Sequence, residues 1–244
     1  SFTFNGTITV KNGTCIGVAV PFSVTILPLP TLTSTLTPAD QCNNNVFHYT
    51  PTGGNGATVF SWYRAAVPGI SNAAASGTGD PAETLVNTTT SPITVTYAYT
   101  FTGSNGCTNT QNVTVSIKPF PVLSSPLNPT TCSYYVFNYT PTSATPGTTF
   151  AWTRATVTGV INYAGYGTGD PNEALDNVTD YPVNVTYAYT LNANGCISNV
   201  QNVVVTVLPN PTITSTLNPL PICSNTTFNY VPTSNLSNST FSWT

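Results

Sequence analysis

The sequence predicts an all-β protein built from tandem β-sandwich repeats, and three observations support this class. Apolar residues alternate with Thr, Ser and Asn over short runs, as in strands that bury one face. Turn residues separate these runs roughly every eight to twelve positions, and no run shows the spacing of a helix. The whole pattern recurs after about ninety residues, which is typical of a repeat protein.

Two sets of anchor residues give the repeat length. One tryptophan and one cysteine return 90 and then 91 positions later; they are Trp62, Trp152 and Trp243, and Cys42, Cys132 and Cys223. Pro-x-Pro pairs mark the joints, at 28/30, 119/121 and 209/211. We therefore expect a partial repeat with the last strands, two complete repeats, and a partial repeat with the first strands. Their ranges are 1–29, 30–119, 120–209 and 210–244.

The tryptophan of each repeat lies in a short alternating run, "FSWYR" (60–64) or "FAWTR" (150–154). One tryptophan per repeat in a central strand is typical of an immunoglobulin-like sandwich, where it fills the core. We expect Trp62, Trp152 and Trp243 to be core residues rather than ligand-stacking residues.

The last two strands of a repeat are predicted to form a hairpin. In "VTYAYTF", Val95, Tyr97, Tyr99 and Phe101 lie on one face, and the second copy repeats this alternation. A turn of the type "GSNGC" or "NANGC" follows, and then a second alternating run rich in valine. The final strand therefore returns antiparallel to the strand before it.

The stretch "CSYYVFNYTPTSATPGTTFAWTRATVTGVINYAGYGTGDPNEALDNVTDYPVNVTYAYTLNANGC" (132–196) resembles the PKD-like repeat of very large bacterial surface proteins, typically exported by type IX secretion. The resemblance covers both complete repeats through shared Cys, Phe-x-Trp, Arg-Ala, Gly-Thr-Gly, Glu, Val-Thr-Tyr and Asn-Gly-Cys anchors. It implies secreted, extracellular β-sandwich modules in long arrays linked to adhesion, gliding or fibre formation, without catalysis. The first partial repeat departs most, with "ITVKNGTC" in place of "YAYTLNANGC".

Charge is scarce in this chain, at 5% of residues and a net charge of −3. The four basic residues are scattered, so we expect no nucleic-acid partner and no binding to an anionic membrane. No apolar run approaches the roughly 18 residues that a membrane span needs. The first residues lack the pattern of a signal peptide, so we expect any export signal to lie outside this chain.

Acidic residues gather in one signature, "GTGDPAE" (77–83), which returns as "GTGDPNE" (167–173). Asp80, Glu83, Asp170 and Glu173 are of the types that hold Ca²⁺ or act as paired catalytic carboxylates. Each copy supplies too few ligands, and an Asp before a Pro is typical of a turn. We favour a structural turn over a weak cation site, and we expect no metal and no cofactor.

Two arginines stand at a constant distance from the glutamates of the signature. Arg64 precedes Glu83 by nineteen residues, and Arg154 precedes Glu173 by the same number. We predict an Arg–Glu ion pair within each repeat that ties the segment after the tryptophan strand back onto the sandwich.

The chain has a single histidine, His48, which Asn138 replaces in the second copy. One histidine excludes a multi-histidine metal centre and argues against a Ser-His-Asp triad. We expect His48 to be an ordinary strand residue, and we predict that the protein is not an enzyme.

Six cysteines in two fixed places per repeat favour disulfides and an oxidising, extracellular compartment. Cys42, Cys132 and Cys223 precede a B-like strand, whereas Cys15, Cys107 and Cys196 lie in the last hairpin. In immunoglobulin topology these places lie at opposite ends of one sandwich, beyond the about 7 Å that a disulfide spans. We favour a staggered bridge, Cys42 to Cys196, over the within-repeat pairs Cys42–Cys107 and Cys132–Cys196.

Two functions follow from these observations. The first is a structural repeat region of an extracellular fibre or cell-surface stalk, whose partners are adjacent repeats or copies of the same protein. The second is an adhesin or glycan-binding module, in which Tyr63, Tyr163 and Tyr166 stack on surface glycans. Repetition favours the first, because none of these tyrosines is kept between the copies.

Both ends of the chain align inside a repeat. Ser1 corresponds to about position 182 and Thr244 to position 153, so the partial repeats together lack an equivalent of residues 154–181. Either the chain is a window on a longer array, or a neighbouring copy completes the partial repeat by strand exchange. We favour the window, because a completed junction would lack its Arg and Glu.

Overall fold

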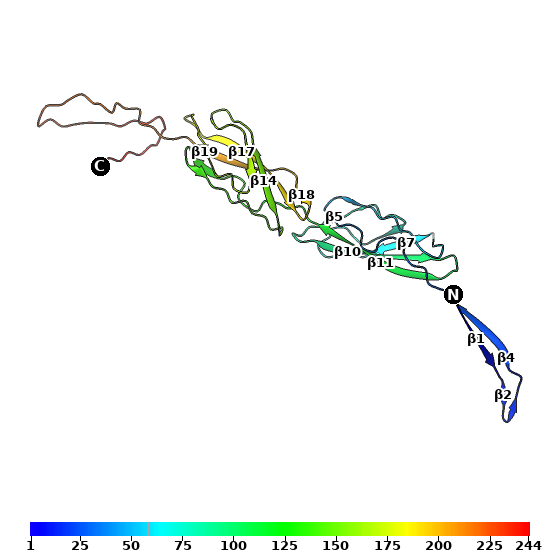
Figure 1. Ribbon diagram of the computed structural model, residues 1–244. Coiled ribbons are helices and arrows are strands. Elements are labelled where there is room, and N and C mark those ends of the chain that lie inside the picture. The colour runs from blue at the N-terminus through cyan, green and yellow to red at the C-terminus, as the bar shows by residue number, and fades with distance from the viewer. Residues whose placement is uncertain (58) are drawn as a thin grey trace. The chain divides into compact units, whose positions relative to one another are not determined.

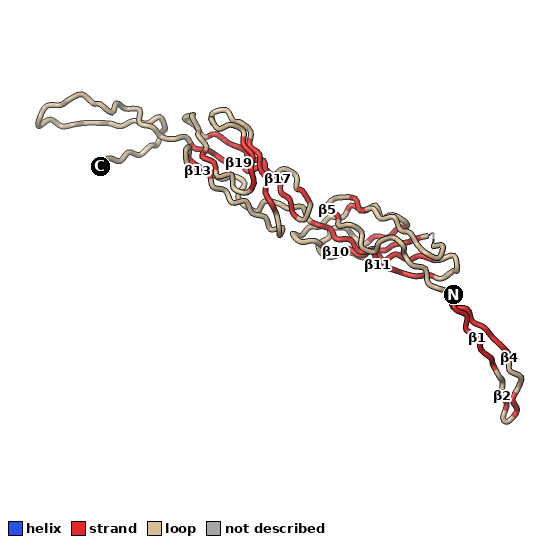
Figure 2. Tube along the Cα trace, viewed as in Figure 1, coloured by secondary structure: helices blue, strands red, loops and turns tan. Residues whose placement is uncertain are grey.

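The computed structural model describes residues 1–57 and 59–244, and within them it contains strands and no helix (Figures 1 and 2). The predicted all-β class is therefore confirmed. A helix long and apolar enough to cross a membrane is absent from the described residues. The chain divides into two compact units, Ser1–Pro119 and Phe120–Thr244, and each contains one β-sandwich with its own core.

The first sandwich is built from seven strands. Five of them form the larger sheet, in the order β5-β11-β10-β7-β8, and β6 pairs with β9. Their bounds are β5 (Gln41–Cys42), β6 (Val46–Phe47), β7 (Phe60–Arg64), β8 (Ala75–Thr78), β9 (Glu83–Thr84), β10 (Ile93–Thr102) and β11 (Thr108–Lys118).

The second sandwich repeats this arrangement with eight strands. The larger sheet runs β12-β19-β17-β14-β15, with the short strand β18 also paired to β17, and β13 pairs with β16. The bounds are β12 (Thr130–Cys132), β13 (Val136–Phe137), β14 (Thr149–Arg154), β15 (Gly165–Thr168), β16 (Glu173–Ala174), β17 (Val183–Ala193), β18 (Cys196–Ile197) and β19 (Gln201–Leu208).

The last hairpin of each sandwich buries the apolar face that the alternation predicts. The inward pairs are Val95–Val115 and Tyr97–Val113 in the first sandwich, and Val185–Val205 and Tyr187–Val203 in the second. These side chains are almost wholly buried. Phe47 packs on Tyr97 at 5.3 Å between ring centroids, and Phe137 packs on Tyr187 at 5.6 Å, so β6 and β13 form the facing layer.

The first cysteine of each sandwich lies in a strand, which the sequence did not predict. Cys42 pairs with Lys118 because β5 runs parallel to the end of β11, and Cys132 pairs with Leu208 in the same way. Parallel pairing with the last strand holds this cysteine at the end of the sandwich where the chain leaves it.

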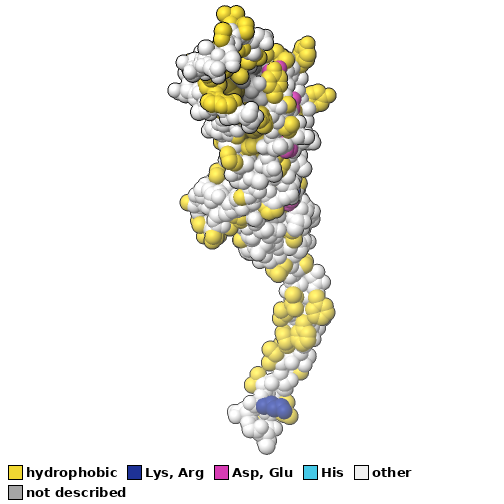
Figure 3. Space-filling model, turned by 90° about the vertical axis from the view of Figure 1, so that its left-hand side faces the viewer, with side chains coloured by type: hydrophobic (Ala, Val, Ile, Leu, Met, Phe, Trp, Pro, Cys, Tyr) yellow, Lys and Arg dark blue, Asp and Glu magenta, His cyan; other side chains and the backbone are white. Residues whose placement is uncertain are grey.

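An N-terminal hairpin precedes the first sandwich. It pairs β1 (Phe2–Ile8) with β4 (Val20–Ile26), and β2 (Lys11–Asn12) with β3 (Cys15–Ile16) near its tip. Among the described residues no third strand joins β1 and β4. Hydrophobic side chains, yellow in Figure 3, gather along this hairpin at the lower end of the view.

The C-terminal segment (residues 210–244) contains one isolated bridge, Ile213 to Ser234, and no named strand. Trp243, which we expected in a core, is 86% exposed, whereas Trp62 and Trp152 are 7% and 6% exposed. Trp62 and Trp152 are buried because they pack edge-on against Tyr97 and Tyr187, which lie in the last hairpin of their own sandwich.

Substitution in the facing layer tests this packing. Phe137→Ala removes a buried ring that contacts Tyr187, so we expect the second sandwich to lose about 3–5 kcal/mol of unfolding free energy. Val136→Ala, next to it but exposed on β13, should cost less than about 1 kcal/mol. Native-state hydrogen exchange resolved by peptide measures both values, and equal losses would contradict the layer assignment.

Candidate functional site

The glycines of the repeated signature have steric roles. A Cβ on Gly77 would lie 2.8 Å from Trp62 Cζ2, and a Cβ on Gly167 would lie equally close to Trp152. Gly79 and Gly169 adopt φ values of 68° and 67°, which side chains disfavour. The Gly-Thr-Gly sequence therefore lets the strand pass under the tryptophan ring and then turn.

The aspartates of the signature accept hydrogen bonds from backbone amides. Asp80 Oδ1 accepts hydrogen bonds from the Tyr49 amide at 2.8 Å and the Ala82 amide at 3.1 Å. Asp170 Oδ1 does the same with Tyr139 and Asn172, at 2.8 and 3.0 Å. Within the described residues no group of three His, Cys, Asp or Glu is placed to hold a metal ion. The aspartates thus join the turn to the facing layer.

His48 differs from the expectation of an ordinary strand residue. It lies just after β6, exposed to solvent, and its Nδ1 lies 2.6 Å from Asp80 Oδ2. Burial opposes ionisation of Asp80, but hydrogen bonds from His48 and the Tyr49 amide lower the pKa of that carboxyl below its usual value. Asn138 replaces His48 in the second sandwich, so the contact belongs to one copy.

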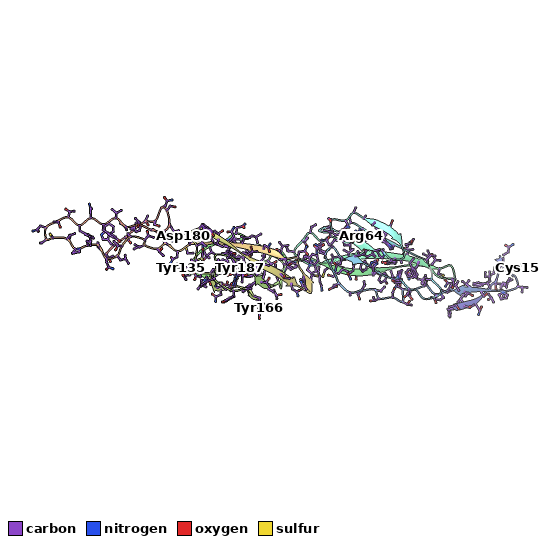
Figure 4. All side chains as sticks on the ribbon, turned by 90° about the horizontal axis from the view of Figure 1, so that it is seen from above. Cys15, Arg64, Tyr135, Tyr166, Asp180 and Tyr187 are labelled. Carbon is purple, nitrogen blue, oxygen red and sulfur yellow. The ribbon has the colours of Figure 1, made fainter. Side chains whose placement is uncertain are left out.

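The structure brings each predicted Arg and Glu together inside the sandwich. Arg64 Nε donates to Glu83 Oε2 at 2.7 Å and Nη2 donates to Glu83 Oε1 at 2.8 Å, a bidentate contact. Arg64 Nη2 also donates to the Ala73 carbonyl at 2.7 Å. The Arg64 side chain is 1% exposed, and Figure 4 shows it within the strands of the first sandwich.

The second sandwich repeats these contacts. Arg154 Nε and Nη2 donate to Glu173 at 2.9 and 3.0 Å, and Nη2 also donates to the Tyr163 carbonyl at 2.7 Å. The guanidinium carbon lies 5.9 Å from the centre of the Tyr187 ring.

A tyrosine completes each cluster, and sequence reasoning missed it. The Tyr97 hydroxyl donates to Glu83 Oε2 at 2.7 Å, and the Tyr187 hydroxyl donates to Glu173 Oε2 at 2.6 Å. Burial raises the pKa of both tyrosines far above its usual value, and the hydrogen bond to glutamate adds to this effect. The signal in the sequence is the repeated "VTYAYT", but alternation alone assigns its tyrosines only to the core.

A buried asparagine in each sandwich was also not predicted from the sequence. Asn177 Nδ2 donates to the Val207 and Tyr181 carbonyls, each at 2.9 Å, and its Oδ1 accepts from Thr179. Asn87 makes the equivalent bonds in the first sandwich. Each asparagine links the loop after the signature to the last strand.

The tyrosines considered for glycan stacking are exposed. Tyr163 and Tyr166 are 88% and 86% exposed, and Figure 4 shows Tyr166 at the edge of the second sandwich. Tyr63, on β7 of the first sandwich, is 54% exposed. Ala73 and Ser76 stand in the first sandwich where Tyr163 and Tyr166 stand in the second, so each sandwich presents a different surface.

The cysteines fall into two groups. Cys42 and Cys196 are disulfide-bonded, whereas four are free thiols: Cys15, Cys107, Cys132 and Cys223. The within-repeat pairs Cys42–Cys107 and Cys132–Cys196 are therefore wrong. Cys42 pairs with the last residue of β11 and Cys107 precedes its first residue, so about 33 Å of strand separates them.

One protein-family match covers the first sandwich. Residues 35–121 match the PKD-like domain. No curated protein matches the chain in sequence.

Several solved structures resemble this chain at low identity. DIP-gamma IG1+IG2 covers 75% of this chain and 98% of its own, at 9% identity and a TM-score of 0.38. Mouse cadherin-23 EC22-24 covers 85% and 74%, at 14% identity and a TM-score of 0.28. The tandem Ig repeats of Dlar cover 74% and 98%, at 10% identity and a TM-score of 0.23.

Removal of one charge tests the buried cluster. Arg154→Met leaves the partly buried Glu173 carboxylate without its cation, so we expect a loss of about 1.5–3 kcal/mol in the second sandwich. Lys118→Met is the control, because the Lys118–Asp40 pair is partly exposed and should contribute less than about 1 kcal/mol. Hydrogen exchange of each sandwich measures the losses, and a small Arg154→Met effect would refute the structural role.

The same cluster predicts an acid-sensitive stability. Burial by itself raises the pKa of Glu83 and Glu173, but hydrogen bonds from the arginine and tyrosine outweigh it and hold both pKa values below normal. A depressed folded-state pKa gives stability that is complete above the unfolded value, about 4.3, and is lost as pH falls through the folded value. Stability should therefore fall steadily below about pH 4.

A Glu173→Gln variant separates this effect from general acid denaturation. Its second sandwich should be less stable at pH 7 and should lose less further stability below about pH 4 than the unaltered sandwich. Asp40→Asn, at the surface ion pair, is the matched control. Equal pH slopes for Glu173→Gln and the unaltered chain would contradict the assignment.

Proposed function

We propose that this chain is a structural repeat region of an extracellular fibre or cell-surface stalk, of the kind formed by large bacterial surface proteins exported by type IX secretion. The observation that carries this proposal is the repetition of the buried Arg–Glu–Tyr cluster, with the same hydrogen bonds, in both sandwiches. Both arginines of the chain, and the glutamates that they bind, form contacts within a single sandwich. This use of scarce charge suits a structural role rather than catalysis.

The module boundaries are part of this proposal. We infer complete repeats at 30–119 and 120–209, a partial repeat with last strands at 1–29, and one with first strands at 210–244. In support, one core cluster runs from Leu32 to Ile117 and the other from Leu123 to Val207, each within one range. The Pro-x-Pro pairs then act as semi-rigid linkers between repeats.

A staggered disulfide gives the proposed fibre a covalent link at its joint. Cys42 and Cys196 are both disulfide-bonded and the other four cysteines are free, so within one chain these two are partners. Cys42 lies at the end of β11 that leads into the joint. Cys196 lies in the hairpin near Gln201, whose Nε2 donates to the Pro121 carbonyl at 3.2 Å, where the chain enters the second sandwich.

Peptide mapping of the oxidised chain without reduction tests this bridge. We expect one crosslinked species that joins the Cys42 and Cys196 peptides and disappears in Cys42→Ser. Cys107→Ser is the matched control and should leave the crosslink intact, because Cys107 is a free thiol. A Cys42–Cys107 crosslink would refute the staggered scheme.

A measurement of the chain's shape in solution tests the proposal of a fibre or stalk. Strands of this length and a short proline-rich joint predict roughly 35–45 Å of length per complete repeat, with the repeats end to end. Small-angle X-ray scattering of the oxidised chain should give an elongated particle. A compact particle with the two sandwiches folded against one another would contradict a fibre or stalk.

A glycan-binding module is the second candidate, and the exposure of Tyr163 and Tyr166 favours it. Aromatic rings that stand free of the surface suit stacking on sugar rings. Glycan-array binding that is lost in Tyr163→Ala and kept in Tyr135→Ala, which changes an exposed tyrosine outside the candidate set, would place adhesion above the structural role.

A further inference from the structure

We propose that each sandwich is a load-bearing module, in which tension along the chain shears the segment that enters the sandwich against its last strand. The entry segments are residues 30–43 in the first sandwich and 121–133 in the second, and the last strands are β11 and β19. This role rests on the proposed fibre or stalk, because tension acts on every repeat of such an assembly.

The entry segment and the last strand of each sandwich run in the same direction. β5 pairs parallel with the end of β11, and β12 pairs parallel with the end of β19. The chain enters a sandwich at the start of its entry segment and leaves it at the end of its last strand. Tension therefore pulls two parallel strands in opposite directions along their length, so the bonds between them are strained together rather than one after another.

In the first sandwich, hydrogen bonds follow the entry segment along most of β11. The Leu32 amide donates to Gln111 Oε1 at 2.6 Å. The Thr114 amide donates to the Leu36 carbonyl at 2.9 Å. The Asn43 amide donates to the last carbonyl of β11 at 2.7 Å. The entry segment is thus attached to this strand from Gln111 to the end.

The second sandwich repeats this series. The Leu123 amide donates to Gln201 Oε1 at 2.8 Å, where β19 begins. The Val204 amide donates to the Leu127 carbonyl at 2.8 Å, and the Ser133 amide donates to the last carbonyl of β19 at 2.9 Å. Because both sandwiches make these bonds, the attachment belongs to the repeat rather than to one copy.

A glutamine side chain begins each series. Gln201 holds the entry segment through both of its amide atoms, because Oε1 accepts from Leu123 and Nε2 donates to the Pro121 carbonyl at 3.2 Å. Gln111 accepts the equivalent bond from Leu32. Replacing a glutamine therefore weakens the attachment while the backbone pairing stays in place.

A buried asparagine braces the end of each last strand. Asn87 Nδ2 donates to the Ile117 carbonyl at 2.8 Å, and Asn177 Nδ2 donates to the Val207 carbonyl at 2.9 Å. Each of these carbonyls lies one residue before the strand ends. The end of the strand that takes up the load is therefore also held by the loop after the signature.

A different pulling direction on the same sandwich separates strands one bond at a time. β17 and β19 are antiparallel, and Val183 lies opposite Val207. The start of β17 and the end of β19 therefore lie side by side at one end of the sandwich. Tension between these two points peels the strands apart instead of shearing them.

Single-molecule pulling on the second sandwich compares the two directions. The full chain carries alanine in place of its six cysteines, one handle at Thr244, and a second handle at Val122→Cys or Tyr181→Cys, two side chains that are each 62% exposed. The Val122 handle shears the entry segment against β19, whereas the Tyr181 handle peels β17 from β19. We expect shear to need roughly twice the unfolding force or more at the same loading rate, because its bonds break together. Equal forces in the two directions would overturn the proposal.

A glutamine variant of the chain with its own cysteines tests the same attachment. The chain is pulled between its ends in reducing buffer, where each sandwich should unfold in one step that releases about 300 Å, from roughly 90 residues at about 3.5 Å each. In Gln201→Leu one of the two steps should occur at lower force, with unfolding on the order of ten times faster under the same load. Asn184→Leu is the matched control, because Asn184 Oδ1 accepts from the Thr206 hydroxyl on the side of β19 that faces β17.

The equivalent variant of the first sandwich completes the comparison. Gln111→Leu should shift the other step, and the chain with both substitutions should shift both steps. Unchanged steps in both glutamine variants, or an equal shift in Asn184→Leu, would overturn the proposal. An elongated particle in scattering whose unfolding force does not depend on the pulling direction would be a structural repeat without load-bearing strands, so this failure would leave the proposed function standing.

Discussion

The buried guanidinium is the constraint on which the rest of each sandwich depends. A charge in a protein interior is tolerated only when a counter-ion and further hydrogen bonds replace the water that it loses. Arg64 meets this requirement with Glu83 and the Ala73 carbonyl, and Arg154 meets it with Glu173 and the Tyr163 carbonyl. The carbonyls lie in the loops before β8 and β15, and the glutamates begin β9 and β16, so the arginine fixes both segments on the tryptophan strand.

Other features of the signature follow from this arrangement. For the glutamate to reach the arginine, the chain must cross the tryptophan ring and turn back, which Gly77 and Gly79 allow in the first sandwich. The aspartate then holds the turn to the facing layer through the Tyr49 amide. The tyrosine of the neighbouring strand donates a third hydrogen bond to the carboxylate. A signature with the composition of a metal or catalytic site is thus an internal tie between layers.

The sandwiches share their interior contacts and differ at the surface. Exposed tyrosines appear in the second where the first has Ala73 and Ser76, while the buried clusters are the same. A repeat whose interior is self-sufficient can change its surface without losing its fold.

The sequence by itself determined the repeat length, the strands and their inward faces, because alternation and spacing are local properties. It also paired Arg64 with Glu83, since both copies keep nineteen residues between them in a chain with almost no other charge. Only the tertiary structure decided that the Tyr97 hydroxyl donates to Glu83 and that the Asn177 amide donates to the Val207 carbonyl. It also decided that Cys42 lies in a strand parallel to β11. These contacts join residues 14 to 76 positions apart, and no local pattern reports which distant partner a polar group meets.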